Sequence, residues 1–334
     1  MSAEVSSVAA LEGVIGKTPP AIHLKVIDHL DETAILWLAK SPLMFAGFSD
    51  AATLAVTVAG GRAGFASADS GTLRLPLATL DDPAAARPGC GFGSLFLAPG
   101  VGETLRVNGR IREVAGEHVL IDIRECYVHC AKALIRSAFW SAGPVSEVSA
   151  DPEGFVSASR FMALATADST GDTDLSPKGD PAGSMARMEG GELWFPDRPG
   201  NRRVDSFRNI LARPQLAALL LVPGSNRVAV VSGRARLTAD SEALRPFEVQ
   251  GKTPTLATQV SELQVELRES AALARAGLWP SAAADPELAP AKMLVAHMKI
   301  NKDKGLAARL ASTLVSIPGL MQKGLDKDYK TNLY

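Results

Sequence analysis

Four arginines and a serine gather in one short stretch of this chain, residues 196–209 (PDRPGNRRVDSFRN). A Pro-Gly pair turns the chain after a predicted strand, and a helix is expected to begin near Arg203 and run to Ala212. The free N–H groups at a helix N-terminus already carry about half a positive charge, so arginines there are unfavourable unless an anion joins them. The stretch therefore predicts a bound phosphate, held by backbone N–H groups, by Arg202 and Arg203, and by the Ser206 hydroxyl.

The same stretch also has a simpler interpretation, a solvated charged turn in which Asp197 and Asp205 neutralise the arginines. Composition alone slightly favours that interpretation. A second cation favours the phosphate, because Lys178 lies in residues 175–181 (LSPKGDP), where the Gly and Pro residues predict a loop.

A repeat in the sequence helps to decide between the two. Two motifs recur at a constant separation of 124 residues, and a third at 139, which indicates an insertion in the second copy. The matched segments are LFLAPG (95–100) with LLLVPG (219–224), GR (109–110) with GR (233–234), and LIRSAFW (134–140) with LARAGLW (273–279). The length of 334 residues agrees with two domains of roughly 150 residues each.

The two copies have lost opposite parts of a site. The first copy has Asp82 and Pro83 where the second has Arg202 and Arg203, and no equivalent of Lys178 is apparent. It cannot hold an anion there. The phosphate loop is therefore expected only in the second copy.

The loss runs the other way in a predicted hairpin strand of the first copy. Alternation places Leu105 and Val107 on one face of that strand and three polar residues, Thr104, Arg106 and Asn108, on the other. The second copy replaces this polar face with Val228, Val230 and Ser232, and it replaces His129 and Lys132 with Arg268 and Ala271. Reciprocal loss predicts one composite site that spans the two halves; the alternative is independent surface drift without a site.

Short strands joined by Gly/Pro turns predict a small antiparallel barrel in each copy. The expected strands are 43–48, 94–98, 104–114 and 119–123 in the first copy, and 160–166, 192–195, 218–222 and 227–238 in the second. We also expect a helix capped by Asp31 that runs to about Lys40, and a helical C-terminal segment broken at Pro318-Gly319. The prediction is a mainly β chain with flanking helices (α+β): a barrel in 1–150, a second in 151–284, and a helical packing arm in 285–334.

Composition excludes several function classes. A net charge of −1 and a pI near 6.5 give no field that would attract nucleic acid or an anionic membrane. Three cysteines do not form a disulfide framework, and without a leader or an apolar span we expect a cytoplasmic protein. Cys126, His129 and Cys130 are too few for a zinc site, so no metal is predicted.

The second half resembles the pyridoxamine 5′-phosphate oxidase-like superfamily, whose members are flavin-binding split barrels. The resemblance is carried by residues 175–181, 196–209, 219–224 and 233–234. The first half resembles a degenerate copy, through 102–110 and 129–137. Single-domain members usually form homodimers with flavin mononucleotide (FMN) in the interface, so the resemblance implies two split barrels forming a pseudo-dimer within one chain, with one flavin.

The resemblance also implies roles for individual residues. The expected cofactor-binding residues are Lys178, Arg198, Asn201, Arg202 and Arg203 at the phosphate, Ser176, Asp180 and Ser206 at the ribityl chain, and Thr104, Arg106 and Asn108 from the first half. The expected catalytic residues are His129, which could donate a proton or orient substrate, and Lys132, which could favour negative charge on reduced flavin or on a substrate carboxylate. A packed histidine and a surface lysine are the alternatives.

The function predicted from these features is an FMN-dependent oxidoreductase that transfers hydride to or from an unidentified small molecule, with a nicotinamide as a candidate electron donor. The alternatives are a deazaflavin-dependent reductase, a non-catalytic flavin- or haem-binding protein with His129 as the haem ligand, and a purely structural double barrel. Further homo-oligomerisation through the C-terminal arm stays open.

Overall fold

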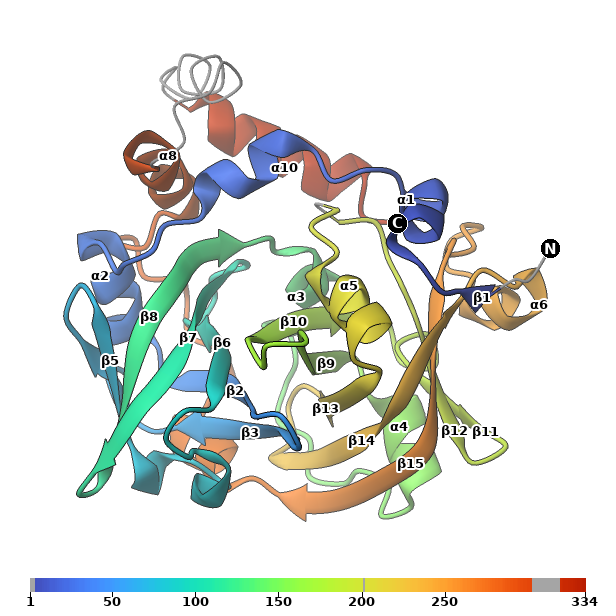
Figure 1. The fold of residues 1–334 in the computed structure, drawn as a ribbon, viewed down its shortest axis with the longest axis horizontal. Helices are drawn as coiled ribbons and strands as arrows, with labels where there is room; N and C mark the ends of the chain where they lie inside the picture. Colours follow the sequence, from blue (N-terminus) through green and yellow to red (C-terminus); the bar gives the residue numbers. More distant parts are fainter. Residues whose placement is uncertain (1–3, 201, 302–318) are drawn as a thin grey trace.

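The computed structural model describes residues 4–200, 202–301 and 319–334, and its strands form two antiparallel sheets (Figure 1). The first sheet has the strand order β3-β2-β6-β7-β8-β5-β4. Its strands are β2 (Leu43–Ser49), β3 (Leu54–Gly60), β4 (Ser67–Ala68), β5 (Thr72–Pro76), β6 (Gly91–Leu97), β7 (Thr104–Ala115) and β8 (His118–His129).

The second sheet has the strand order β10-β9-β13-β14-β15-β12-β11, and β1 (Glu4–Val5) adds to it by pairing with β14. Its other strands are β9 (Phe161–Ala167), β10 (Thr173–Gly179), β11 (Arg187–Glu189), β12 (Glu192–Pro196), β13 (Gln215–Leu221), β14 (Arg227–Thr238) and β15 (Ala257–Glu269). When β2 is matched to β9 and the remaining strands follow in chain order, the two strand orders become identical. The predicted duplication and the mainly β fold with two split-barrel halves are therefore confirmed.

Helices flank the sheets. They are α1 (Val8–Ile15), α2 (Glu32–Lys40), α3 (Lys132–Arg136), α4 (Pro152–Ala158), α5 (Asp205–Ala212), α6 (Ser241–Leu244), α7 (Ala271–Ala276), α8 (Pro290–Ile300) and α10 (Leu320–Thr331), with the 3₁₀ helices η1 (Pro20–Lys25), η2 (Leu77–Thr79), η3 (Pro83–Ala85) and η4 (Arg245–Phe247). As predicted, the Asp31 side chain caps α2 by accepting a hydrogen bond from the Ala34 N–H at 2.8 Å. No helix in the described part of the chain is long and apolar enough to cross a membrane.

Two local predictions were wrong. Lys178 lies in strand β10 and not in a loop, because residues 173–179 pair along their whole length with β9. Pro177 is tolerated there because β10 is an edge strand of its sheet. Helix α5 begins at Asp205, two residues later than expected, because Arg202 and Val204 have left-handed backbone conformations (φ 57° and 55°) that cannot continue a helix.

The two halves share an apolar interface. Besides the core of each barrel, a third buried cluster joins strands of both sheets, and the rings of Phe45 and Phe161 meet within it at 5.4 Å. The contacts are reciprocal: α3 of the first half lies against β10 of the second, and α7 of the second lies against β3 of the first. A glycine permits each approach, since a Cβ on Gly179 would lie 2.0 Å from the Ala133 carbonyl oxygen and one on Gly60 would lie 2.4 Å from that of Ala272.

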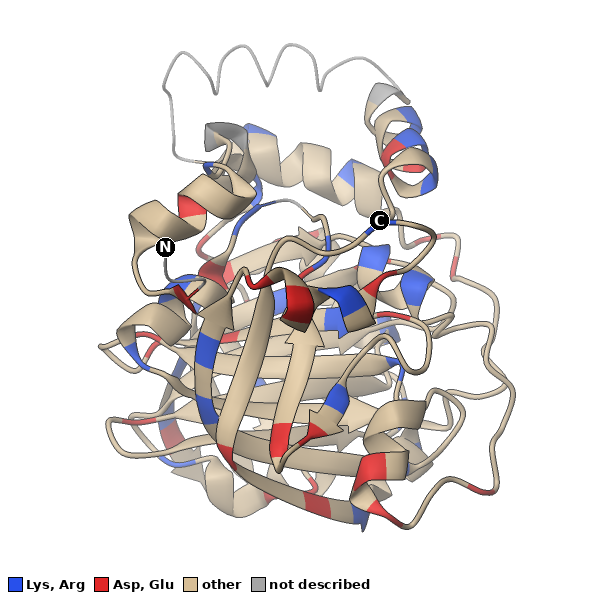
Figure 2. Ribbon diagram, turned by 90° about the vertical axis from the view of Figure 1, so that its right-hand side faces the viewer, with Lys and Arg blue, Asp and Glu red and all other residues tan. Residues whose placement is uncertain are grey.

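The C-terminal helices lie on one side of this double barrel. Helix α10 runs across the top of both halves in Figure 1, beside α8 and α1, and the turned view of Figure 2 shows helices above the same end of the strands. Met293 of α8 packs into the core of the first barrel. The predicted helical arm is thus helical at 290–300 and 320–331, its predicted break at Pro318 lies outside the described residues, and the limits 1–150, 151–284 and 285–334 stay predictions.

Candidate functional site

A cavity of about 1030 Å³ lies at the seam between the two halves. The first half lines it with the end of β8 and with α3, and the second half lines it with β10, with the chain that leads into α5, and with residues 252–255. The two ends of the chain complete the wall through Val14, Ile15, Pro19 and Ile22 on one side and Asp328, Asn332 and Tyr334 on the other.

The cavity is strongly electropositive. Among the residues that the structure describes, its lining contains eight Lys and Arg side chains against four aspartates, although the full sequence has a net charge of −1. The cations are Arg106, Lys132, Arg136, Lys178, Arg198, Arg202, Arg203 and Lys252. Because both halves contribute to this excess, the wall of the cavity is suited to an anion and is composite, as the reciprocal loss predicted.

Arg106 joins the two halves at the floor of the cavity. Its side chain is 1% exposed, and its Nη2 donates to the Ser176 hydroxyl at 2.9 Å and to the Leu175 carbonyl oxygen. Its Nη1 donates to the Tyr127 hydroxyl at 2.6 Å. Leu105, the preceding residue on β7, is buried in the core of the first barrel, which confirms the alternation predicted for this strand.

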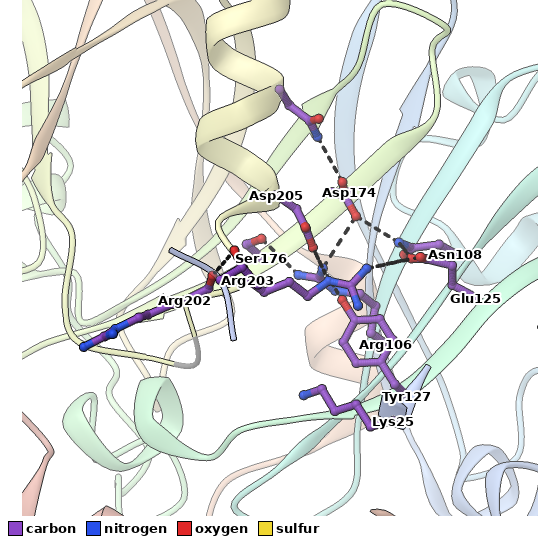
Figure 3. A network of polar contacts seen from close by, with 12 residues as sticks. Lys25, Arg106, Asn108, Glu125, Tyr127, Asp174, Ser176, Arg202, Arg203 and Asp205 are labelled. Atoms are coloured by element: carbon purple, nitrogen blue, oxygen red, sulfur yellow. Dashed lines mark hydrogen bonds and ion pairs between the residues drawn. The ribbon is translucent and has the colours of Figure 1, made fainter. Parts of the chain in front are cut away.

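Asp205, at the start of α5, lies between arginines of both halves (Figure 3). Arg203 donates to it through Nε, and Arg106 Nη1 lies 3.5 Å from its Oδ2. Arg203 also reaches the first half, where its Nη2 donates to Glu125 Oε1 at 3.1 Å. The arginine-rich segment 196–205, called the basic loop from here on, is thus held to the first half by two ion pairs, Arg203–Glu125 and Asp205–Arg106.

Three cations surround the buried ring of Tyr127. The guanidinium carbons of Arg203 and Arg106 lie 4.4 Å and 5.3 Å from the ring centroid, and Lys25 Nζ lies 5.0 Å from it. Burial, together with the positive charges of Arg203 and Arg106, lowers the pKa of Lys25 to about 8. The Lys25 ammonium donates to the Val128 carbonyl oxygen at 2.9 Å.

Carboxylates accompany the remaining cations of the basic loop. Arg198 Nε donates to Asp180 at 2.6 Å, and Lys178 Nζ lies 3.5 Å from Asp197. Burial raises the pKa of both aspartates above the ordinary value, against the opposing effect of these cations. The charged-turn interpretation is therefore supported in part, since Asp197 and Asp205 do pair with cations, but the cations lining the cavity outnumber the aspartates.

Arg202 differs from its neighbours because its side chain is exposed. The Thr18 hydroxyl donates to its carbonyl oxygen at 2.7 Å, and its guanidinium lies against Gly16, where a Cβ would approach Nη1 to 3.2 Å. The left-handed backbone of Arg202 and of the β-branched Val204 is strained. Such strain is common in loops that hold a ligand.

Most of the predicted site residues meet at this cavity. Those that line it are Arg106, His129, Lys132, Ser176, Lys178, Asp180, Arg198, Arg202, Arg203 and Ser206. Thr104 and Asn108 are not among the described residues that line it, since Thr104 is fully buried and the Asn108 amide donates to Asp174 at 3.0 Å. Their contact with the cofactor stays a prediction. Asn201 lies outside the described residues. The roles of the lining residues stay predictions.

The two residues proposed for catalysis lie in different surroundings. Burial, with the nearby charges of Arg106 and Lys25, lowers the pKa of His129 well below the ordinary value, so its imidazole is neutral at pH 7. Its Nδ1 is buried and accepts or donates no hydrogen bond within the described ranges. The surface-lysine alternative is wrong, because Lys132 is 4% exposed and its Nζ lies 2.9 Å from Asp328 of α10.

Several residues of the site could not be found from the sequence. Glu125 and Asp174 pair with the arginines from behind, and Arg136, Asp328 and Tyr334 lie in the cavity wall. Of these residues, only Arg136 lies in a motif that the sequence analysis singled out, the repeated LIRSAFW. Within the described part of the chain, no three His, Cys, Asp or Glu side chains are grouped as metal ligands, and the three cysteines are free thiols.

Two split barrels related by a pseudo-twofold axis, with a basic cavity at their seam, define the class of fold. Residues 152–272 match the family model described as pyridoxamine 5′-phosphate oxidase. The match covers the second half alone. The first half is assigned to the same fold by its identical strand order.

Comparison with solved structures gives distant likenesses. HupZ of Group A Streptococcus has 12% identity over 36% of this chain and 90% of its own, with a TM-score of 0.28. General Stress Protein 26 from Bacillus anthracis str. Sterne has 15% identity over 34% and 92%, with a TM-score of 0.27. A protein titled F420 reductase has 16% identity over 35% and 98%, with a TM-score of 0.26. No curated protein sequence matches this chain.

Proposed function

We propose that the cavity binds one FMN per chain and that the protein is a flavin-dependent oxidoreductase acting on a small molecule. The observation that supports this most strongly is the excess of eight cations over four aspartates in a cavity built by both halves. A phosphate group carries the complementary charge and binds well to arginine forks and to N–H groups at the start of a helix.

The residues present fit the phosphate end of FMN. Lys178, Arg198, Arg202 and Arg203 line the cavity around the first turn of α5, and Ser206 adds a hydroxyl there. Asp180 and Asp197 each lie beside a cation of the cavity, Arg198 and Lys178, so part of their negative charge is already compensated. Asp180 Oδ1 is buried and makes no hydrogen bond with any described residue, which suits a ribityl hydroxyl donor.

The chemistry would come from the flavin, which supplies hydride transfer when it is bound. The chain's own residues would bind, orient and exclude water. His129, held neutral by burial, can accept or donate a hydrogen bond at Nδ1 and is a poor source of an imidazolium proton. Lys132 brings a buried positive charge to the same wall and would favour negative charge nearby.

The pseudo-symmetric position, where residues 81–82 of the first half meet the start of α7 of the second, supports a single site. There Asp81 occupies the start of α7, where it accepts hydrogen bonds from the Ser270 hydroxyl at 2.5 Å and from the Ala272 N–H at 2.8 Å. A carboxylate of the chain thus neutralises the helix end, and neighbouring Asp82 adds a second negative charge. This supports the proposal of one flavin per chain.

The test is the identity of the chromophore that the purified protein retains or takes up. FMN gives a flavin absorption spectrum and the corresponding mass after release, whereas a deazaflavin or haem gives a different mass, and haem gives a dominant Soret band. Rapid mixing with a reduced nicotinamide then tests turnover. Absence of binding of every flavin would contradict the proposal, and a bound flavin that no reductant reduces would favour a binding protein.

A further inference from the structure

The C-terminal end of the described chain lines the proposed cofactor cavity. Asp328, Asn332 and Tyr334 are part of the cavity wall, although α10 is separated from the basic loop by more than a hundred residues in sequence. Helix α10 crosses the seam above the two sheets in Figure 1. The segment 328–334 therefore forms part of the wall that a ligand of the cavity would contact.

The ring of Tyr334 is contacted by two cations of the cavity. The guanidinium carbons of Arg136 and Arg198 lie 5.5 Å and 5.4 Å from its centroid. Arg136 comes from the first half and Arg198 from the basic loop of the second, so the ring joins the two contributions to the site. A guanidinium plane that stacks on an aromatic ring is less available to a planar or anionic ligand.

Backbone oxygens of the same segment accept hydrogen bonds from two cations of the cavity. Arg136 Nε donates to the Leu333 carbonyl oxygen at 2.6 Å, and Lys252 Nζ donates to the Tyr334 oxygen at 2.8 Å. These are charge-assisted hydrogen bonds, which are stronger than bonds between neutral groups. They are also the kind of contact that phosphate or carbonyl oxygens of a ligand would make.

The segment also contacts a fourth cation, Lys132, through the Asp328 carboxylate. Asp328 lies 2.9 Å from Lys132 Nζ, and this ion pair, together with positively charged Arg136, lowers the pKa of Asp328 against the opposing effect of its partial burial. The neighbouring Tyr329 hydroxyl donates to Glu103 at 3.0 Å and accepts from the Ala131 N–H at 3.2 Å, which fixes α10 on the first half. The segment thus presents a negative charge, acceptor oxygens and a ring to four cations.

We propose that residues 328–334 are a built-in competitor at the cofactor cavity, which competes with the phosphate and ring system of a flavin for Lys132, Arg136, Arg198 and Lys252. This inference rests on the proposed function and concerns its regulation. If the segment occupies the cavity for nine-tenths of the time, the apparent dissociation constant of FMN is raised on the order of tenfold, because only the open fraction binds.

The experiment compares FMN binding to the full chain with binding to the double variant Asp328→Asn/Tyr334→Ala by stopped-flow flavin fluorescence. The double variant is expected to bind on the order of tenfold more tightly, mainly through faster association. Lys330→Ala, a change on the exposed side of the same helix, is the matched control and should bind as the wild type does. Hydrogen exchange of residues 320–334 should increase in the wild type when FMN is added.

The failures of the two proposals can be told apart. The competitor proposal is overturned if FMN binds to the wild type and the double variant with equal dissociation constants, or more weakly to the double variant. It is also overturned if hydrogen exchange of residues 320–334 decreases when FMN binds. In each of these cases the segment covers the bound flavin, and the flavin site stands. If FMN binds to neither protein, the proposed function fails, and the same comparison with inorganic pyrophosphate decides the competitor proposal. Equal or absent pyrophosphate binding would then overturn it.

Discussion

Arg106 Nη2, on β7 of the first half, donates a hydrogen bond of 2.9 Å to the hydroxyl of Ser176, on β10 of the second. Repeats that drift independently would retain complete sites or lose them one half at a time. Here each half supplies a polar surface that is complete only against the other, and the bond joins the two surfaces. The wall of the cavity is therefore composite, and neither half contains the whole of it.

Loss of the Arg203 guanidinium should weaken binding of FMN far more than binding of riboflavin. In Arg203→Ala the phosphate loses a charge-assisted contact worth about 2 kcal/mol, which is roughly a thirtyfold increase in dissociation constant for FMN alone. Arg203 also pairs with Asp205 and Glu125, so both ligands should lose some affinity through the seam. Fluorescence titration with each ligand separates the two effects. Arg245→Ala, 75% exposed, is the control, and equal weakening of both ligands by Arg203→Ala would argue against a phosphate contact.

The substitution Asp82→Arg should leave FMN affinity and stoichiometry almost unchanged. It restores one cation at the pseudo-equivalent position, but Asp81 still occupies the start of α7 through Ser270 and Ala272. Calorimetric titration checks both quantities. A second flavin bound per chain, or damage as large as that caused by Arg203→Ala, would contradict a single site.

Removal of the Arg106 charge should destabilise the joined halves strongly. Arg106→Met leaves the partly buried Asp174 and Asp205 without one of their cations, and breaking a buried ion pair costs about 3–5 kcal/mol. Urea unfolding measures the loss of free energy. The surface pair Arg112–Asp122, whose side chains are about half exposed, gives the control Arg112→Ala, which should cost less than about 1 kcal/mol. A similar loss of unfolding free energy in both variants would show that the Arg106 ion pairs stabilise the protein no more than an exposed surface pair does.

The buried Lys25 should make stability depend on pH in the alkaline range. Its folded pKa of about 8 lies below the ordinary value of 10.5, so between these pH values the unfolded chain binds more protons than the folded chain. Stability attributable to this group therefore rises with pH across that interval, by on the order of 3 kcal/mol, and is constant below it. The difference in unfolding free energy between wild type and Lys25→Met isolates the effect. A difference that does not change between pH 8 and 10.5 would disprove the lowered pKa.

The sequence predicts the strands well because the two copies constrain each other. The predicted strand 227–238 has the bounds of β14, and the alternation over 104–108 places Arg106 on the correct face. Lys178 was misplaced because Pro177 and Gly179 are typical of loops, whereas in this fold they lie in a strand that ends its sheet. Local propensity was overridden there by tertiary pairing.

The partners of the site could not be predicted, since they depend on contacts between distant segments. Glu125 meets Arg203 across 78 residues, and Arg136 meets Leu333 across 197. No periodicity or motif connects such pairs. The sequence therefore identifies most of the cations of the cavity and three of its aspartates, Asp180, Asp197 and Asp205. It does not identify Glu125, Asp174 or the segment 328–334 that lines the cavity.

Titration of the purified chain with FMN, followed by flavin fluorescence and by calorimetry, tests the composite anion site most directly. We expect saturation at one FMN per chain, with riboflavin binding much more weakly because it lacks the phosphate that the cations of the cavity would bind. Saturation at two FMN per chain, or equal affinity for FMN and riboflavin, would contradict a single phosphate site at the seam.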